Sequence, residues 1–364
     1  MRRLLAALLC FVCLPALAAG FVAIDLPGAQ LNALAADGRV ASGSVVGGAS
    51  GGFRWDQAGR ARELPDAVSA QGISASGRYI VGSALDAQQR EVAAYWDGDG
   101  AAHLLGGLPG AVARAGVLSL GLTIDDYLDV AGSANTRDDH RVAFDWHRGE
   151  GMRRLPSLDA DDSGGVLGLG NAAGRVLGWS GRGGGVRRNL IWLAGNAHAL
   201  DEPLASAELT GGSRDATTLL GLSMRTSPSQ ESFRWSKRSG VQPLLQATTA
   251  LPRPVRFTAS SDDGQILAGS AGSGARRVAV VWTSAQGAEP LDAWLARSGI
   301  AIPPGWTLIA STAISADGRR IGGYGQHAGH FQSFIIDLPS AETAANASGD
   351  RSMTLRRPLR EAHP

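Results

Sequence analysis

Short runs of apolar residues recur along the chain, and each run is bounded by glycine or by small polar residues. Their length, about four to eight residues, is typical of β-strands rather than of helices. Six of the runs carry a tryptophan at the same place, and successive tryptophans are 41 to 50 residues apart. The six are Trp55, Trp96, Trp146, Trp192, Trp235 and Trp282. The pattern predicts a repeated unit of short strands.

A second element precedes each tryptophan strand. It is a tight turn, such as Asp37-Gly38 or Ser76-Gly77, followed by an apolar run that contains glycine. Glycine suits such turns because it accepts a positive φ. We expect the recurring glycine of each run to mark a bulge or a close approach of two backbones. These glycines are Gly47, Gly82, Gly132, Gly178, Gly269 and Gly322, and the fifth unit keeps Gly221 without the Asp-Gly turn.

Each unit contains four short strands. In the second unit they are expected at residues 70–75, 78–84, 92–96 and 102–107. A unit of this length with four strands is typical of a β-propeller blade. The sequence therefore predicts an all-β fold, a seven-bladed β-propeller over residues 19–339.

The seventh unit supplies only three strands, with Ile335 or Ile336 at the place of the tryptophan. A spare strand lies at residues 21–27, ahead of the first unit. If it pairs with the seventh unit, the propeller closes and no sheet edge is left exposed for aggregation. We therefore expect the N-terminal strand to close the fold.

One short helix is expected between the sixth and seventh units, within residues 291–306. Asp292 suits the N-cap position and Gly299 the end of the helix, and two consecutive prolines prevent its continuation.

The two ends of the chain differ from the repeats. Residues 1–18 begin with a positive charge, continue with an apolar run and end in small residues, as a secretory signal peptide does. The only cysteines, Cys10 and Cys13, would leave with it. Residues 340–364 contain too few apolar side chains to bury and are expected to be disordered. The mature protein is predicted to be secreted or periplasmic, with no membrane span.

The charge of the chain is balanced, with 34 basic and 33 acidic residues and a net charge of +1. Binding to nucleic acid needs a concentrated positive face, so the balance argues against that partner. We expect a monomer that binds an extracellular or envelope ligand.

The repeats resemble the bacterial extracellular repeats of the HAF family. The resemblance rests on the small-residue, Asp-Gly and apolar-Gly element followed by an aromatic tryptophan strand, as in RVAFDW and ESFRW. It also rests on residues 291–325, LDAWLARSGIAIPPGWTLIASTAISADGRRIGGYG. It covers nearly all of the mature chain, although the literal His-Ala-Phe triplet is absent. The resemblance implies an exported bacterial protein, and the family offers no catalytic residues to carry over.

The innermost strand of each unit should line the axial channel. These strands consist mainly of small and aliphatic residues, and the fifth is expected at residues 215–220. Carboxylates occur only at the strand ends, as Asp215 and Asp262. General acid–base catalysis needs a titratable group at the reacting atom, so the sequence favours a binding or interaction module. The alternative is a propeller hydrolase or lyase that acts on extracellular polysaccharide.

The loops between the second and third strands should converge on one face. Four of them end in arginine, and acidic residues and a histidine lie nearby; the set is Arg90, Arg141, Arg188, Arg277, Asp138, Asp139 and His140. Guanidinium groups bind carboxylates and hydroxyls of a glycan or protein through paired hydrogen bonds. The alternative is that these charges only solvate the loops.

Three further residues are candidates for the ligand face. Trp179 lies outside the tryptophan register and is expected in a loop as an exposed aromatic ring. His327 and His330 are three residues apart in the corresponding loop of the seventh unit. Two histidines are an incomplete zinc site, and solvated loop residues are the alternative.

One run is similar to a calcium-binding loop. Asp159, Asp161 and Ser163 place oxygen atoms at the first, third and fifth positions, and Gly164 follows at the sixth. The acid expected at the twelfth position is missing, because Gly170 stands there. An ordinary acidic surface turn is the alternative, and calcium is the one cofactor that the sequence suggests.

Overall fold

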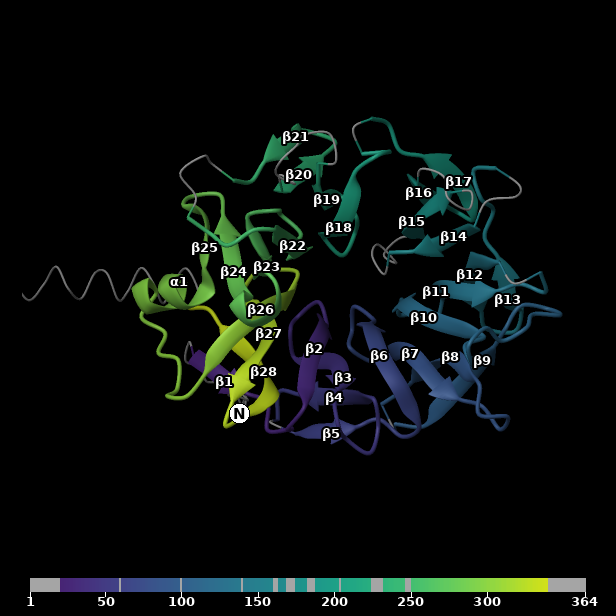
Figure 1. Ribbon diagram of the computed structural model, residues 1–364, viewed down its shortest axis with the longest axis horizontal. Coiled ribbons are helices and arrows are strands. Elements are labelled where there is room, and N and C mark those ends of the chain that lie inside the picture. Colours follow the sequence, from purple (N-terminus) through teal and green to yellow (C-terminus); the bar gives the residue numbers. More distant parts are fainter. Residues whose placement is uncertain are drawn as a thin grey trace, which may run out of the picture.

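The computed structural model describes residues 20–58, 60–98, 100–138, 140–159, 163–167, 174–181, 187–202, 204–223, 232–245 and 250–339. Within these ranges the chain is almost entirely β-structure, with one α-helix and one short 3-10 helix. Sheets of strands stand around a common centre, which is the architecture of a β-propeller (Figure 1). The predicted signal peptide, residues 1–18, and the predicted tail, residues 340–364, lie outside the described residues.

Each repeat forms consecutive antiparallel strands, named a to d here from the centre outwards. Repeats one to three form β2 (Ala29–Leu34), β3 (Val40–Val45), β4 (Gly52–Asp56), β5 (Ala61–Glu63), β6 (Ala67–Ile73), β7 (Ile80–Leu85), β8 (Glu91–Trp96), β9 (Ala102–Gly106), β10 (Ser119–Ile124), β11 (Val130–Asn135), β12 (Arg141–His147) and β13 (Gly151–Arg154). Each set of four is a separate sheet in this order.

Repeats four to six form β14 (Ser163–Val166), β15 (Arg175–Gly181), β16 (Arg188–Leu193), β17 (Asn196–Ala199), β18 (Glu208–Gly212), β19 (Thr218–Leu222), β20 (Ser232–Ser236), β21 (Gly240–Pro243), β22 (Val255–Ser260), β23 (Ile266–Ala271), β24 (Val278–Thr283) and β25 (Gly287–Pro290). A 3-10 helix at Gly274–Arg276 lies between β23 and β24. The strands of repeats five and six share one eight-stranded sheet, because Gly212 of β18 pairs with Ala259 of β22.

Repeat seven forms β26 (Thr307–Ile314), β27 (Arg320–His327) and β28 (His330–Asp337). The strand beyond β28 is β1 (Gly20–Ala23), which pairs with it in antiparallel register and places Phe21 opposite Ile336. The N–H of Ile24 also donates to the carbonyl of Ser333, 2.9 Å away, and the Ile24 side chain is fully buried. The two ends of the repeat region therefore lie side by side (Figure 1).

Glycine at the middle of strand b lets strands a and b approach closely. A Cβ atom on Gly82 would lie 2.0 Å from the carbonyl oxygen of Ser69, and the register of β6 shifts beside it. This confirms the expected close approach and bulge. The predicted positions were wrong in two repeats: strand b of repeat one uses Gly43 rather than Gly47, and repeat seven uses Gly323 rather than Gly322. In repeat one a later glycine of the motif was chosen, and in repeat seven the first of two adjacent glycines was chosen.

The tryptophans of the register join neighbouring repeats. The indole N–H of Trp96 donates to the carbonyl of Pro65 in the preceding repeat (3.0 Å), and that of Trp192 donates to Pro156 in the same way (2.7 Å). Four of the six tryptophans are buried: Trp55, Trp96, Trp192 and Trp282. Large aromatic rings with one polar atom suit such packing. These four form core between the sheets.

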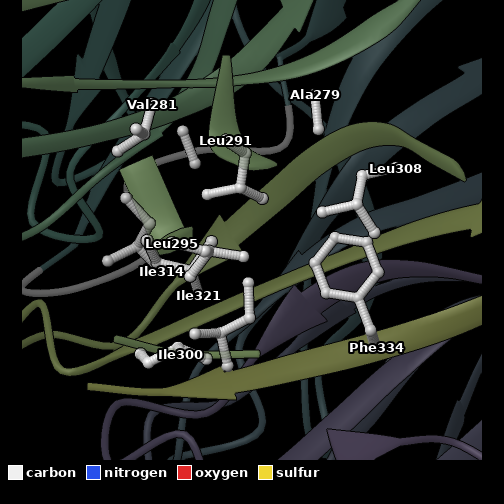
Figure 2. Packing of buried hydrophobic residues seen from close by; sticks show 11 residues of the cluster. Ala279, Val281, Leu291, Leu295, Ile300, Leu308, Ile314, Ile321 and Phe334 are labelled. Carbon is white, nitrogen blue, oxygen red and sulfur yellow. The ribbon is translucent and has the colours of Figure 1, made fainter. Parts of the chain in front are cut away.

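The helix α1 (Leu291–Arg297) packs against repeats six and seven. Figure 2 shows Leu291 and Leu295 directed at Val281 and at the core that includes Phe334. The expected N-cap was wrong, because Pro290 holds that position and Asp292 lies in the first turn. Proline directly before the helix fixes its φ without needing its missing N–H. Gly299 follows the helix with a φ of +73°, as its place in the sequence predicts.

Candidate functional site

A cavity of about 350 Å³, lined by strands of several repeats, lies on the axis. It is lined by the last residues of six strands a (β2, β6, β10, β18, β22 and β26) and by the turns that follow them. The corresponding turn of repeat four includes residues 168–173, which lie outside the described residues. Because strands a and b are antiparallel, all a–b turns lie at one end of the propeller and all b–c turns at the other. We call these the a–b end and the b–c end.

The a–b turns share a local design. In repeat seven, Ser315 Oγ donates to Asp317 Oδ1 (2.7 Å), Asp317 accepts the N–H of Arg319 (3.0 Å), and Gly318 has a φ of +72°. The second residue of the turn lines the cavity in five of the six described repeats, all but the first. This residue is alanine in three repeats and charged in three others: Ala36, Ala75, Asp126, Arg214, Asp262 and Ala316.

Backbone hydrogen bonds link these second residues from one repeat to the next. The N–H of Asp262 donates to the carbonyl of Ala316 (3.0 Å), that of Ala316 to Ala36 (2.8 Å), and that of Ala36 to Ala75 (2.8 Å). The next link uses a side chain, because Asp126 accepts the N–H (3.1 Å) and the hydroxyl (2.5 Å) of Ser76. The rim of the cavity is therefore a hydrogen-bonded chain of turns.

Arg214 crosses the mouth of the cavity. It follows β18, and its guanidinium donates to the carbonyls of Leu34 in repeat one and Ile73 in repeat two (3.2 Å to Ile73). These repeats lie across the centre from β18 (Figure 1). No carboxylate of the described residues lies within 4.0 Å of the guanidinium. Burial lowers the pKa of Arg214, and the more distant Asp262 and Asp126 raise it only in part.

Three carboxyl groups line the same cavity, and their environments differ. Burial, and then the charge of Asp215, raise the pKa of Asp262, whose carboxylate accepts no hydrogen bond from the described residues. Burial also raises the pKa of Asp125, although that group accepts the N–H groups of Tyr127 and Asp129 (2.9 Å each). In Asp126 burial is outweighed by the hydrogen bonds from Ser76, so the pKa is lowered. Asp262 is thus the unpartnered acid.

Neutral groups complete the lining. The Oγ1 atom of Thr258 is buried and has no hydrogen-bond partner, which is costly for a hydroxyl group in a protein interior. Gln71 is exposed at the cavity, and the Tyr127 side chain at its edge is 87% exposed. A large exposed ring beside a cavity is a common contact for ligands.

The arginines predicted to form a ring at the b–c end are partnered within their own surroundings. Arg90 binds Asp86 of its own loop at 2.8 Å, Arg188 pairs with Asp159, and Arg277 donates to Ser270 Oγ at 3.0 Å. Arg141 begins β12 and is exposed. None of the four lines the axial cavity.

The remaining predicted ligand residues are dispersed. Asp138 and His140 are exposed near the β11–β12 turn, and Asp139 lies outside the described residues. His327 donates to or accepts from Gln332 (3.0 Å) and stacks on Trp306, whereas His330 is exposed.

Trp179 was predicted in a loop because it lies outside the tryptophan register. This prediction was wrong, since Trp179 lies in strand β15. It is partly buried there, and the guanidinium of Arg187 lies 4.0 Å from its ring centre. The alternation of β15 directs it onto Gly165 of the neighbouring strand, where a side chain would leave no room.

In the calcium-like run, one predicted ligand is paired with an arginine that would compete with a metal ion. The carboxylate of Asp159 is paired with Arg188, Ser163 begins β14, and Asp161 lies outside the described residues. No group of three or more histidine, cysteine or acidic side chains with metal-binding geometry occurs among the described residues. The calcium site stays a prediction.

The sequence interpretation missed Arg214 because it misplaced strand a of repeat five, and it missed Asp125 and Asp126 because it considered strand a of repeat three and not the turn after it. That strand is β18 at Glu208–Gly212, and residues 215–220 are the turn and the start of β19. The a–b turn of this repeat has Ala216 at a φ of +56°, where repeats one, two, six and seven have glycine, so the turn is hard to recognise in the sequence. Aligning the second residues of the turns would have found the three charged exceptions to alanine.

Comparisons with known proteins support the fold alone. No family model matches the chain, and no curated protein matches it in sequence. Among solved structures, it is similar to the β-propeller domain of the Trilobed protease from Pyrococcus furiosus, which has an open velcro topology (9% identity, TM-score 0.52, covering 85% of this chain and 95% of that one).

Two larger proteins are similar as well. A puromycin-hydrolyzing peptidase from Mycobacterium tuberculosis has 16% identity and a TM-score of 0.53, with 86% of this chain and 51% of that chain covered. A puromycin hydrolase complexed with PGG has 12% identity and a TM-score of 0.54, with 87% and 53% covered. The chain thus spans about half the length of these two proteins. In the described part of the chain, no helix has the length and apolar character needed to cross a membrane.

Proposed function

We propose that this protein is an exported, monomeric binding module whose ligand occupies the axial cavity at the a–b end. The observation that carries the proposal is the placement of Arg214 and Asp262 in one cavity, each without an ionic partner among the described residues. An unpaired charged group in a partly buried position destabilises the fold. Such groups are concentrated in binding and catalytic sites, where a ligand can pair with them. Of the four arginines predicted at the b–c end, Arg90, Arg188 and Arg277 already have side-chain partners.

The scaffold for this function is a seven-bladed propeller closed by the N-terminal strand. Three contacts between the ends of the repeat region support closure: the β1–β28 pairing, the hydrogen bond from Thr312 Oγ1 to Leu31 O (2.6 Å), and that from Ala316 N to Ala36 O (2.8 Å). Deleting residues 19–28 removes β1 and the buried Ile24. We expect a fall in melting temperature of about 10 °C or more, since several kcal/mol of burial and hydrogen bonding is lost. An unchanged thermal transition would argue against closure.

Export and the HAF-family assignment rest on sequence. The signal-like residues 1–18 and the resemblance of the repeats to exported bacterial proteins support a secreted or periplasmic location. A ligand from the envelope or the extracellular medium, a glycan or a protein, fits that location, and nucleic acid does not fit the balanced charge.

The binding proposal is tested by comparing the two ends directly. Binding of the purified protein to envelope fractions is measured for the wild type, for Asp262→Asn, and for the triple variant Arg141→Gln, Arg188→Gln, Arg277→Gln. We expect Asp262→Asn to weaken binding and the triple variant to leave it unchanged. The opposite result would place the ligand on the b–c loop face.

A second candidate function, hydrolysis or elimination on an extracellular polysaccharide, is supported by one observation. Burial and Asp215 raise the pKa of Asp262, whereas the hydrogen bonds from Ser76 outweigh burial and lower that of Asp126. Two carboxyl groups with opposite shifts suit an acid and a base. We would measure new reducing ends and unsaturated products on neutral and acidic polysaccharides. Activity that is lost in Asp262→Asn and in Asp126→Asn supports catalysis; no product from the wild type argues against it.

A further inference from the structure

The ligand chemistry of the axial cavity follows from which of its polar groups are already satisfied. Most of them are: Asn32 Nδ2 donates to Ala70 O (2.8 Å), Thr312 Oγ1 donates to Leu31 O, and Asp126 is held by Ser76. These bonds connect one repeat to the next. They leave few lone pairs or protons for a ligand, so the specificity of the cavity must come from the groups that remain.

Two of the remaining groups carry full and opposite charges. The guanidinium of Arg214 has only main-chain carbonyls as partners, and it keeps N–H groups beyond those used on Leu34 and Ile73. The carboxylate of Asp262 accepts no hydrogen bond from the described residues. The two are coupled electrostatically, yet they are further apart than the 4.0 Å of an ion pair. A cation and an anion that share a cavity without contact leave room for a molecule between them.

The rest of the cavity sets size and polarity. Its volume of about 350 Å³ is at the small end for ligand sites. Ala75 and Ala316 give the lining an apolar part that can contact a short aliphatic group. A small ligand with two charged ends and a compact apolar part matches this arrangement.

We propose that the axial cavity binds a small zwitterion, a short peptide or amino acid with free termini, whose carboxylate is received by Arg214 and whose ammonium group is received by Asp262. This inference rests on the proposed function, because it names the ligand class of that same site. Paired opposite charges in a partly desolvated cavity discriminate strongly against a ligand that lacks either end, since the protein group is then left unpaired.

The experiment uses four probes and calorimetric titration of the purified protein. The probes are dialanine, N-acetyl-dialanine without the ammonium group, dialanine amide without the carboxylate, and a neutral trisaccharide. We expect dialanine to bind and each blocked peptide to bind about tenfold more weakly or worse, the size expected of one charge-assisted hydrogen bond. Equal binding of all three peptides would overturn the proposed ligand class.

Variants assign each terminus to its residue. In Asp262→Asn the advantage of dialanine over its N-acetyl form should vanish while the advantage over the amide persists. In Arg214→Gln the reverse is expected. Arg214→Lys, which keeps the positive charge, should restore part of the discrimination and guards against a folding defect in Arg214→Gln. Asp37→Asn, an exposed carboxylate of an a–b turn that does not line the cavity, is the matched control and should bind as the wild type does.

The outcomes separate the ligand class from the site. Binding of the trisaccharide that is weakened by Asp262→Asn, without binding of dialanine, keeps the axial site and overturns the zwitterion. Absence of binding by all four probes, together with binding to envelope fractions that is insensitive to Asp262→Asn, overturns both proposals.

Discussion

The two ends of the propeller use polar residues in different ways. At the a–b end, side chains and turns reach into the next repeat or across the axis, as Ala36 does with Ala75 and as Arg214 does with Leu34. At the b–c end, Arg90 is satisfied within its own loop by Asp86, and Arg277 reaches no further than Tyr324 of the next repeat. The a–b end therefore has contacts across the axis, whereas these contacts of the b–c end stay within a repeat or reach its neighbour.

This difference shows where unsatisfied groups accumulate. A loop that satisfies its own charges needs no ligand, and its residues are free to vary. At the a–b end, second turn residues are fixed in place by backbone bonds, so a charged residue there is held at the axis whether or not it has a partner. Asp262 is such a residue, and Arg214 is held at the axis instead by the bonds of its guanidinium to Leu34 and Ile73. Counting charges on loops is therefore a weaker guide to a site than asking which charges the fold leaves unpaired.

The largest expected effect is on stability, and it is measured by removing one arginine from each end of the propeller. Arg214→Ala removes two charge-assisted hydrogen bonds across the axis and leaves two carbonyls without these donors. We expect it to lower the free energy of unfolding by about 3 kcal/mol. Arg277→Ala at the b–c end removes part-buried bonds to Ser270 of its own repeat and to Tyr324 of the next repeat, none of which crosses the axis, and should cost about 0.5 kcal/mol. Denaturant unfolding measures both, and similar losses would contradict the contrast.

A smaller effect is expected from glycine in the turns of each end. Gly77 of an a–b turn has a φ of +74°, and a Cβ atom there would lie 2.8 Å from Val40 Cβ of the neighbouring repeat. Gly274 of a b–c turn has a φ of +55° with no atom within 4 Å of its Cβ position. Alanine is strained by the left-handed conformation at both positions, but only in Gly77→Ala does its Cβ atom also clash with Val40. We expect losses of about 2 kcal/mol and about 1 kcal/mol, by thermal or chemical unfolding. Equal losses of unfolding free energy would mean that the a–b turn adjusts to the added methyl group as easily as the b–c turn does.

The repeat of the fold is readable from sequence because its signals are local. The tryptophan at one place in each unit and the glycine of strand b follow from packing between adjacent strands, so they recur wherever that packing does. The errors occur where a local signal is duplicated or lost. Pro290 takes the cap position that Asp292 also suits, and Ala216 at positive φ conceals the turn of repeat five.

The candidate site was much less predictable because it depends on contacts across the axis. Nothing near Arg214 in sequence indicates that its partners are Leu34 and Ile73, 180 and 141 residues away. In the same way, four loops that end in arginine predict a ring only if the arginines lack local partners, and Asp86 and Asp159 provide them for two. The sequence shows which charged residues are present, whereas only the structure shows which of them lack a partner and can therefore bind a ligand.

The smallest expected effect is the pH dependence of the stability that His147 contributes beside the a–b turn of repeat three. His147 Nδ1 lies 2.5 Å from Asp129 of an a–b turn, and its Nε2 lies 3.3 Å from Asp145. Burial opposes the charged ring, but the two carboxylates outweigh it and raise the pKa of His147. A raised pKa in the folded state means that the charged histidine stabilises the fold below the ordinary value of about 6.5, and that this contribution is lost as pH rises through the folded value. We expect His147→Gln to be less stable than the wild type by about 1 kcal/mol near pH 5.5 and by much less near pH 8.5. Denaturant unfolding across this range measures the difference, with His330→Gln, an exposed histidine of the b–c end, as the control. A difference that grows with pH would show that the cluster favours the neutral ring and that the rim is not held by this charge.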